Sequence, residues 1–178
     1  MVSPVKTVVV AHYQENLAWI PENSNVKFDV ITKDEHCPNV GREPFSFLWY
    51  IVSNYNSLQG EYFFVQGNPF DHCPNLFEEV SQPVTKFRWL GRGGERYVSD
   101  AHGNPHHSGL PVEDVCCRLT NKCGITSYQF TPGGQFAITA EEIKSKPLQF
   151  YLLALTIMAE NFNSHPWCFE RLWETIFS

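Results

Sequence analysis

The sequence predicts a single α/β domain over residues 1–178, with a mostly parallel central sheet flanked by helices and a helical C-terminus. Three observations predict this class. Short apolar runs are typical of buried strands, a helical repeat lies between two of these runs, and apolar stripes at helical spacing fill the C-terminal region. The length also suits one domain with one hydrophobic core.

The first strand is expected over residues 5–11. Its three valines at 8–10 form a β-branched run without alternation, which is typical of a strand buried on both faces. Two further apolar runs, at residues 26–31 and 61–66, predict the second and third strands.

A helix is expected between the second and third strands. Pro44 suits a first helical turn, and apolar residues recur at helical spacing from Leu48 to Leu58. Gly60 then suits a position just past the helix end. A strand, a helix and a strand with short connections form a βαβ unit, so we expect these strands to be parallel.

The rest of the chain divides into an irregular part and a helical part. Residues 90–125 carry many glycines and prolines and predict a long irregular excursion. Thr139 and Glu142 have the spacing of a capping box, which predicts a helix start. Further helices are expected after Pro147 and Pro166, each with an apolar stripe.

Composition excludes several classes of function. Aromatic residues make up 15% of the chain and charged residues 18%, the reverse of what disorder requires. A net charge of −6 without a basic run argues against a binder of duplex nucleic acid. The sequence has no apolar stretch of transmembrane length and no hydrophobic signal segment, so we expect a soluble cytoplasmic protein.

The six cysteines permit several interpretations. Three of them, Cys116, Cys117 and Cys123, lie close together in the sequence. A chain of this size does not need disulfides to form a core, so we expect reduced structural thiols, with a disulfide or a zinc site as alternatives.

Polar residues follow each predicted strand, at 11–15, 32–36 and 66–72, and a fourth polar segment at 39–43 leads into the long helix. In parallel α/β sheets, ligands bind beyond the carboxyl ends of the strands. These four segments are therefore expected to meet at one binding site.

The segment at 39–43 has the chemistry of an anion site. Gly41 permits close approach of the backbone to a ligand, and the free amides of a helix start favour an anion. The planar fork of Arg42 suits a phosphate. The alternative is a tight turn in which Arg42 and Glu43 form an ordinary surface pair.

The segment at 66–72 carries Asp71 and His72, which could bind a metal, accept a proton or hydrogen-bond a substrate. Gly67 and Pro69 restrict the backbone conformation and thereby set the direction of the Asp71 and His72 side chains. The alternative is a rigid turn in which Asp71 caps the following segment.

Two further groups of polar residues stand out. Gly103 and Pro105 interrupt the histidines at 102, 106 and 107, so we expect a solvated flexible loop there rather than a metal site on a helix. Glu170 and Arg171 begin the last helix beside its apolar stripe. Glu170 is either a catalytic base or one half of a surface ion pair.

The sequence lacks the glycine-rich motifs of dinucleotide and P-loop enzymes and the nucleophile motif of α/β hydrolases. Instead, several segments in combination resemble a group of microbial, fungal and viral proteins of unknown function, commonly labelled glycosyltransferase-like. These segments are residues 9–19, 39–43, 64–72, 134–138 and 170–177.

The resemblance implies a compact Rossmann-like fold of the GT-A type, with a nucleotide-diphospho-sugar and a hydroxyl acceptor such as a glycan as partners. Enzymes of this type usually carry Asp-x-Asp after the third strand, where this chain has Gln66-Gly67-Asn68. Any Mn or Mg ion would then depend on Asp71 and His72. The residues implied to bind the donor are Ala11, His12, Tyr13, Asp34, Asn39, Gly41, Arg42, Gln66, Gly67 and Gln135.

The implied reaction is displacement at the anomeric carbon by an acceptor hydroxyl, with Glu170, Asp71 and His72 as catalytic candidates. Two alternatives belong to other classes. One is a non-catalytic nucleotide- or carbohydrate-binding module of the same fold. The other is a metal-dependent phosphoesterase built from His12, Asp34, His36, Asp71 and His72.

Overall fold

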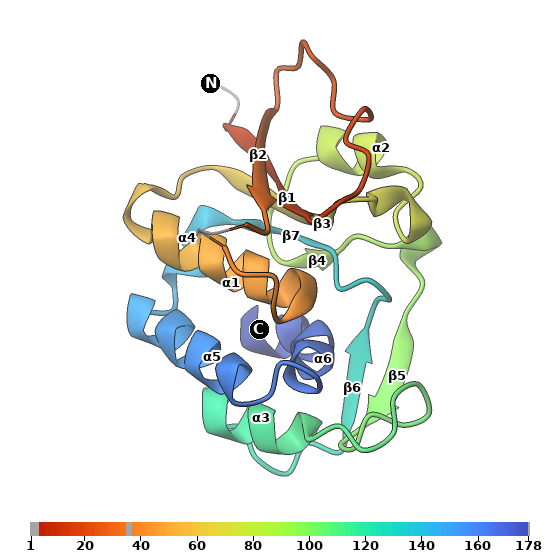
Figure 1. The fold of residues 1–178 in the computed structure, drawn as a ribbon, viewed down its shortest axis with the longest axis vertical. Helices are drawn as coiled ribbons and strands as arrows, with labels where there is room; N and C mark the ends of the chain where they lie inside the picture. Colours follow the sequence, from red (N-terminus) through yellow and green to blue (C-terminus); the bar gives the residue numbers. More distant parts are fainter. Residues whose placement is uncertain (1–3, 35–36, 178) are drawn as a thin grey trace.

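The computed structural model describes residues 4–34 and 37–177. Its main sheet has five strands in the order β2-β1-β3-β7-β4 (Figure 1). Their bounds are β1 Lys6–His12, β2 Lys27–Thr32, β3 Glu61–Gln66, β4 Arg88–Trp89 and β7 Phe136–Thr139.

The sheet is mixed rather than mostly parallel. β1 runs parallel to both β2 and β3, as the βαβ unit predicts, but β7 is antiparallel to β3 and to β4. The expectation of a mostly parallel sheet is therefore wrong for half of the strand pairs. A βαβ unit fixes the direction only of the strands that it connects, and β4 and β7 are too short to be recognised from periodicity.

The burial of β1 on both faces is confirmed. Val8 and Val10 pack on one side of the sheet with Phe63, Leu76 and Val80. Val9 and Ala11 pack on the other side, in the larger of the two clusters. Because both faces are covered, β1 is apolar from Val8 to Ala11, and Thr7 near its start is also buried.

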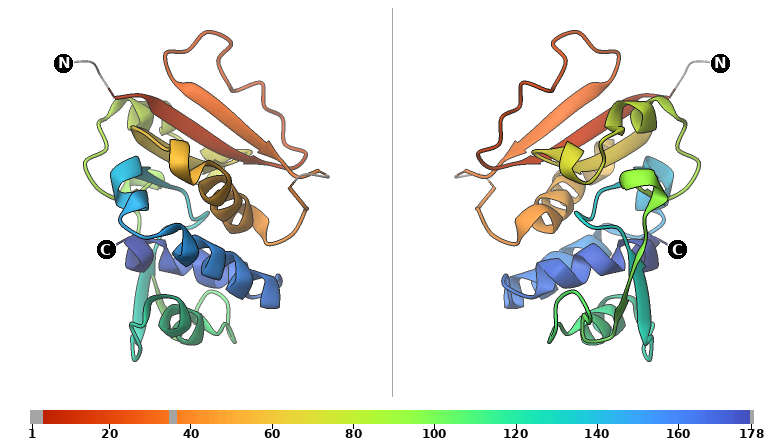
Figure 2. Two further views of the ribbon diagram at one scale, coloured as in Figure 1. Left: turned by 90° about the vertical axis from the view of Figure 1, so that its left-hand side faces the viewer. Right: turned by 90° about the vertical axis from the view of Figure 1, so that its right-hand side faces the viewer.

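Helices cover the two faces unequally. On one side lie α1 (Arg42–Asn54), α5 (Leu148–Glu160) and α6 (His165–Phe177), and on the other lies the short α2 (Leu76–Ser81) (Figure 2). A 3-10 turn, Tyr55–Ser57, extends α1 towards Gly60. The capping box at Thr139 and Glu142 is confirmed, and it begins α4 (Ala140–Lys144).

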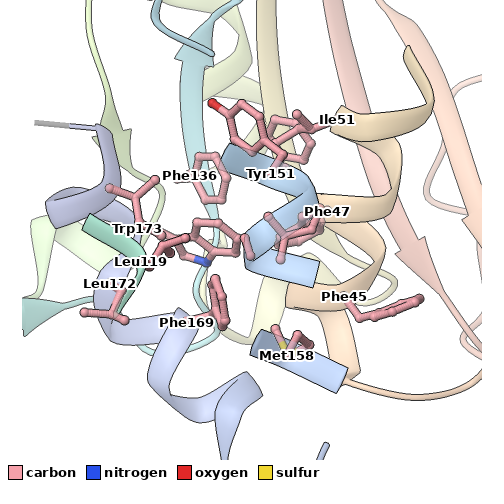
Figure 3. Packing of buried hydrophobic residues seen from close by; sticks show 14 of the residues in the cluster. Phe45, Phe47, Ile51, Leu119, Phe136, Tyr151, Met158, Phe169, Leu172 and Trp173 are labelled. Carbon is pink, nitrogen blue, oxygen red and sulfur yellow. The ribbon is translucent and has the colours of Figure 1, made fainter. Parts of the chain in front are cut away.

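Aromatic rings join α1, the sheet and α6. Phe47 lies 5.9 Å from Phe136, and Phe136 lies 5.1 Å from Trp173, measured between ring centroids (Figure 3). All three side chains are fully buried. This cluster fixes the positions of α1 and α6 relative to the sheet at β7.

The segment at 90–125 is not the irregular excursion that its glycines predict. It contains β5 (Tyr97–Asp100) and α3 (Val112–Thr120), and β5 pairs antiparallel with β6 (Ser127–Phe130) in a second, two-stranded sheet. Two 3-10 turns, Pro69–Asp71 and Arg92–Gly94, complete the fold. A helical signal was present, because the buried face of α3 repeats at helical spacing: Val112, Val115, Cys116 and Leu119.

The cysteines differ from the expectation of reduced thiols in one pair. Cys117 in α3 and Cys123 beyond its end form a disulfide, whereas Cys37, Cys73, Cys116 and Cys168 are free and buried. The pair forms because the C-terminal end of α3 and the turn that follows it bring the two side chains together. Among the described helices, none has the length and apolar character needed to cross a bilayer.

Candidate active site

A cavity of about 330 Å³ lies where α1 and α6 begin, beside the end of β3 and the turn that precedes β7. This volume is at the lower end of the range of small-molecule sites. Its lining residues are Arg42, Glu43, Pro44, Gln66, His72, Tyr97, His106, His107, Phe130, Pro132, Gly133, Gly134, Pro166, Trp167 and Glu170. Of the four polar segments expected to meet, those at 39–43 and 66–72 contribute to this cavity, together with the histidines at 106–107 and Glu170.

Glu170 is the buried carboxyl group of this cavity. Its side chain accepts a hydrogen bond of 2.8 Å from the backbone N–H of Gly133, and its Oε2 lies 3.6 Å from Nη1 of Arg171. Burial raises the pKa of Glu170 to about 7, although Arg171 and the Gly133 amide favour the charged form. A carboxyl group with this pKa can take up or release a proton near neutral pH.

The conformation of the turn at Gly133 places this amide beside Glu170. Gly133 has φ of +83°, and a Cβ placed there would lie 2.5 Å from the ring of His72. Glycine is therefore required both for the backbone conformation and for the packing of His72 against the turn. The sequence Gly133-Gly134 thus brings His72 and Glu170 to the same wall of the cavity.

Arg42 and Glu43 lie at the start of α1. They are far from Gly133 in the sequence but line the same cavity. Glu43 accepts a hydrogen bond of 3.3 Å from the side-chain amide of Gln66, and its other oxygen lies 3.5 Å from Nε of Arg42. The Arg42 guanidinium lies 4.4 Å from the ring centroid of Trp167. The pair therefore belongs to the cavity and is not merely a surface pair.

Aromatic and imidazole rings form one side of the cavity, which we call the aromatic wall: Tyr97, His106, His107 and Phe130. His106 lies 4.9 Å from Tyr97 and 5.6 Å from Phe130 between ring centroids. His102 and His106 are exposed, as a solvated loop predicts, although the His106 ring also contacts Tyr97 and Phe130; the expectation is wrong for His107, which is partly buried. The two-stranded β5-β6 sheet and α6 provide the surfaces against which this loop folds.

His107 and Arg171 connect the aromatic wall to α6. The imidazole of His107 stacks on Trp167 with 4.1 Å between ring centroids. The guanidinium of Arg171 is completely buried, lies 4.4 Å from the centroid of Phe130 and contacts Nδ1 of His107 at 3.0 Å. The alternative of a surface ion pair at 170–171 is therefore wrong, because both side chains are buried.

Four of the residues expected in the site line the cavity: Arg42, Gln66, His72 and Glu170. Asp71 lies beside it, in a second hollow of about 360 Å³ that shares His72, Tyr97 and Pro132 with the cavity. Gln135, in contrast, has a structural role. Its buried side chain accepts from the N–H of Gln66 and donates to the carbonyl of Pro69, so it cross-links two segments and does not line the cavity.

The end of β1 is not part of the cavity lining. Ala11 is buried in the core and Tyr13 is exposed. His12 is held between the hydroxyl of Thr32 and the carbonyl of Glu15. The reason is local: Glu15 folds back to accept from the N–H of Tyr13, and its carboxylate occupies the space beside Gly67, so this segment closes on itself.

The segment after β2 is likewise outside the lining. Asp34 lies in a separate hollow with Tyr50, and Asn39 is exposed. Gly41 is buried and provides the left-handed start of α1, with Phe45 filling the space beside it. His36, which the phosphoesterase interpretation requires, lies outside the described residues. Of its described residues, His12 and Asp34 do not line the cavity or the second hollow with His72.

The residues present do not form an evident metal centre. Within residues 4–34 and 37–177, no group of three or more His, Cys, Asp or Glu side chains is arranged to hold a metal ion. Asp71 accepts a hydrogen bond of 3.0 Å from Asn68, and His72 packs against Gly133. Among the described residues, Asp71 and His72 thus have no third ligand of this kind beside them.

Sequence reasoning did not include Glu43, Trp167 or the aromatic wall among the site residues. Glu43 and Trp167 could have been found, because they lie within or next to segments already singled out. The wall as a whole gives no local signal, since its members become neighbours only when the two-stranded β5-β6 sheet packs beside α6.

Comparison with protein-family models, with curated proteins and with solved structures finds no match to this chain. Its chemistry must therefore be inferred from the cavity itself. The cavity offers one buried carboxyl that titrates near neutrality, one arginine beside an indole ring, and a wall of aromatic faces. These are groups that can move a proton, bind an anion and pack against a ring.

Proposed function

We propose that this protein is a glycosyltransferase that moves a sugar from a nucleotide-diphosphate donor to an acceptor hydroxyl. The observation that carries the proposal is the position of Glu170, a buried carboxyl with a pKa of about 7 in a cavity lined by aromatic rings. A base with this pKa is half ionised near neutral pH and can accept the proton of an attacking hydroxyl.

The size and lining of the cavity support a sugar as the reacting group. About 330 Å³ is room for one ring together with bound water, and the faces of Tyr97, Phe130 and Trp167 can pack against it. The second hollow, which begins at His72 and Tyr97, extends the available space for the remainder of an elongated donor or acceptor.

Arg42 supports a diphosphate as the leaving group. Its side chain is about half exposed, at the start of a 13-residue helix whose dipole favours negative charge. A guanidinium can bind phosphate oxygens through two parallel hydrogen bonds. In this proposal the parallel β2-β1-β3 unit plays the part of the nucleotide-binding half of a GT-A-like fold, with Arg42 at the donor end.

The reaction we propose is a single displacement. The acceptor oxygen forms a bond to the anomeric carbon while the bond from that carbon to the diphosphate oxygen breaks, and its electron pair leaves with the diphosphate. The hydroxyl proton passes to Glu170. Arg42 and the α1 amides stabilise the charge that develops on the departing diphosphate.

A two-stage experiment tests the proposal. UDP-, GDP-, CMP- and dTDP-sugars are first screened by thermal shift, with and without Mn, because a ligand that binds the folded state raises the melting temperature. The best donor is then assayed for turnover with wild type and with Glu170→Gln. We expect a shift with at least one donor and a loss of turnover of about 10²- to 10⁴-fold in the variant.

The matched control is Glu78→Gln, which changes an exposed carboxylate on α2. It should leave binding and turnover unchanged. The absence of a thermal shift with every donor would contradict the proposal. A thermal shift without turnover over a wide range of acceptors would favour a non-catalytic binding module.

A further inference from the structure

We infer that Arg171 holds His107 as the neutral tautomer with its proton on Nε2, so that the aromatic wall presents a fixed hydrogen-bond donor rather than a proton-transfer group. His107 lines the cavity, and Arg171 lies behind it in the protein interior. The inference concerns the loop at residues 101–111, which lies outside the segments that carry the family resemblance.

The contact between the two side chains decides the tautomer. Nη2 of Arg171 lies 3.0 Å from Nδ1 of His107. A guanidinium carries only donors and stays protonated in proteins. Nδ1 must therefore accept the hydrogen bond, and the proton of the neutral imidazole is left on Nε2.

Arg171 cannot readily turn away from this contact. Its Nη1 donates to the carbonyl of Trp167 at 2.7 Å, and its Nε donates to the hydroxyl of Ser99 at 3.2 Å. The side chain has no exposed surface, and the ring of Phe130 covers it. Each N–H edge of the fork therefore has an assigned partner from a different part of the fold.

The charges around His107 disfavour a second proton on its ring. Burial lowers the pKa of His107, and Arg171, His106 and Arg42 act in the same direction. These groups belong to α6, to the loop of His107 itself and to α1. Glu170 faces Arg171, at 3.6 Å, and Trp167 occupies the stacking contact with His107.

Arg171 is thus a positioning residue for two cavity groups. It lies beside the carboxyl of Glu170 and fixes the ring of His107. A donor on His107 selects a ligand that offers an oxygen acceptor at this wall, such as a sugar hydroxyl. This selectivity rests on the proposed function, whereas the tautomer does not.

Nitrogen-15 NMR of the side-chain imidazoles tests the inference on the intact protein without ligand. We expect His107 to show a pyridine-like Nδ1 and a pyrrole-like Nε2 at pH 8, and to take up a second proton only with a midpoint below 6.5. His106, the next residue in the chain, contacts Tyr97 and Phe130 instead and provides the reference signal in the same spectrum. The signals are assigned through the backbone, so no variant has to fold.

Two results would overturn the inference: a proton on Nδ1 of His107 at pH 8, or protonation of both nitrogens with a midpoint at or above about 6.5, the ordinary value. Ser99→Ala removes one partner of Arg171 and should leave the tautomer unchanged, because the contacts with Trp167 and His107 remain. Failure of every nucleotide-sugar to bind would contradict the proposed function but would not alter the tautomer, so the two failures can be told apart.

Discussion

The backbone N–H of Gly133 donates a hydrogen bond of 2.8 Å to the carboxylate of Glu170, across 37 positions of sequence. This contact joins the turn before β7 to the beginning of α6, and it places the one buried carboxyl of the lining beside His72. Neither residue is informative alone, since a glycine turn and a helix-start glutamate are common features. Their contact holds the Glu170 carboxyl, a titratable group, inside the cavity.

The first prediction concerns the pH dependence of stability. The pKa of Glu170 is raised from 4.5 to about 7, so folding favours its neutral form. The resulting stabilisation is complete below pH 4.5 and is lost as the pH rises through about 7. Glu170→Gln stays neutral at every pH. We therefore expect wild type and variant to have similar unfolding free energies near pH 4.5, with the variant more stable by about 3 kcal/mol near pH 8.

Urea denaturation of both proteins at the two pH values measures this difference. Other titrating groups are common to both chains and cancel in the comparison. A difference in unfolding free energy that does not change between pH 4.5 and pH 8 would show that Glu170 has an ordinary pKa.

The second prediction separates backbone strain from packing at the Gly133 turn. Gly133→Ala adds a methyl group 2.5 Å from the His72 ring at φ of +83°, whereas Gly94→Ala adds one at φ of +76° with no atom within 4 Å. Both variants place an alanine in the left-handed conformation, which lowers the free energy of unfolding by roughly 1 kcal/mol. Only Gly133→Ala also displaces His72.

We expect thermal or urea denaturation to show a larger loss for Gly133→Ala than for Gly94→Ala, by about 1–3 kcal/mol. The same variant should weaken ligand binding, because His72 and the Gly133 amide both belong to the cavity. Equal losses in the two variants would mean that the His72 ring moves aside freely.

The third prediction concerns the arginine at the start of α1. Arg42→Gln removes the charge beside Trp167 and should weaken the binding of a nucleotide-diphosphate by about tenfold or more, equivalent to about 1.4 kcal/mol. Calorimetry with the donor found in the screen measures this. Arg118→Gln is the control, since Arg118 pairs with Glu160 between α3 and α5 and does not line the cavity. Equal affinity in the Arg42 variant and wild type would remove Arg42 from the donor site.

The fourth prediction concerns the disulfide after α3. Cys117 and Cys123 close a short loop, so replacing both with serine should lower the unfolding free energy by about 2 kcal/mol. Neither residue lines the cavity, so ligand binding should persist in the folded variant. Thiol titration of unfolded, unreduced wild type should find the four free cysteines. Six thiols in that titration would show that the disulfide does not form.

The local elements were the most predictable part of the fold. The strand at 61–66 has the predicted bounds, β1 and β2 lie within one residue of theirs, and the Thr139 capping box begins a helix. These features depend on neighbours in the sequence: β-branched runs, proline and glycine at helix ends, and a side chain that caps the backbone. The glycine-rich middle was less predictable, because the apolar face of α3 lies among residues typical of loops.

For the candidate site, the sequence by itself identified Arg42, Gln66, His72 and Glu170 as candidates, and all four line the cavity, whereas the described residues of the predicted segments at 11–15 and 32–36 do not. Only the tertiary structure decided which side chains of those segments face it. Gln135 became a cross-link and Ala11 a core residue, whereas His107 gained a buried arginine behind it. The physical reason is that burial and hydrogen-bond partners are properties of packing. A glutamate carboxyl in water has a pKa near 4.5. Once α6, the Gly133 turn and Arg171 surround Glu170, burial raises its pKa to about 7, and it can accept a proton near neutral pH.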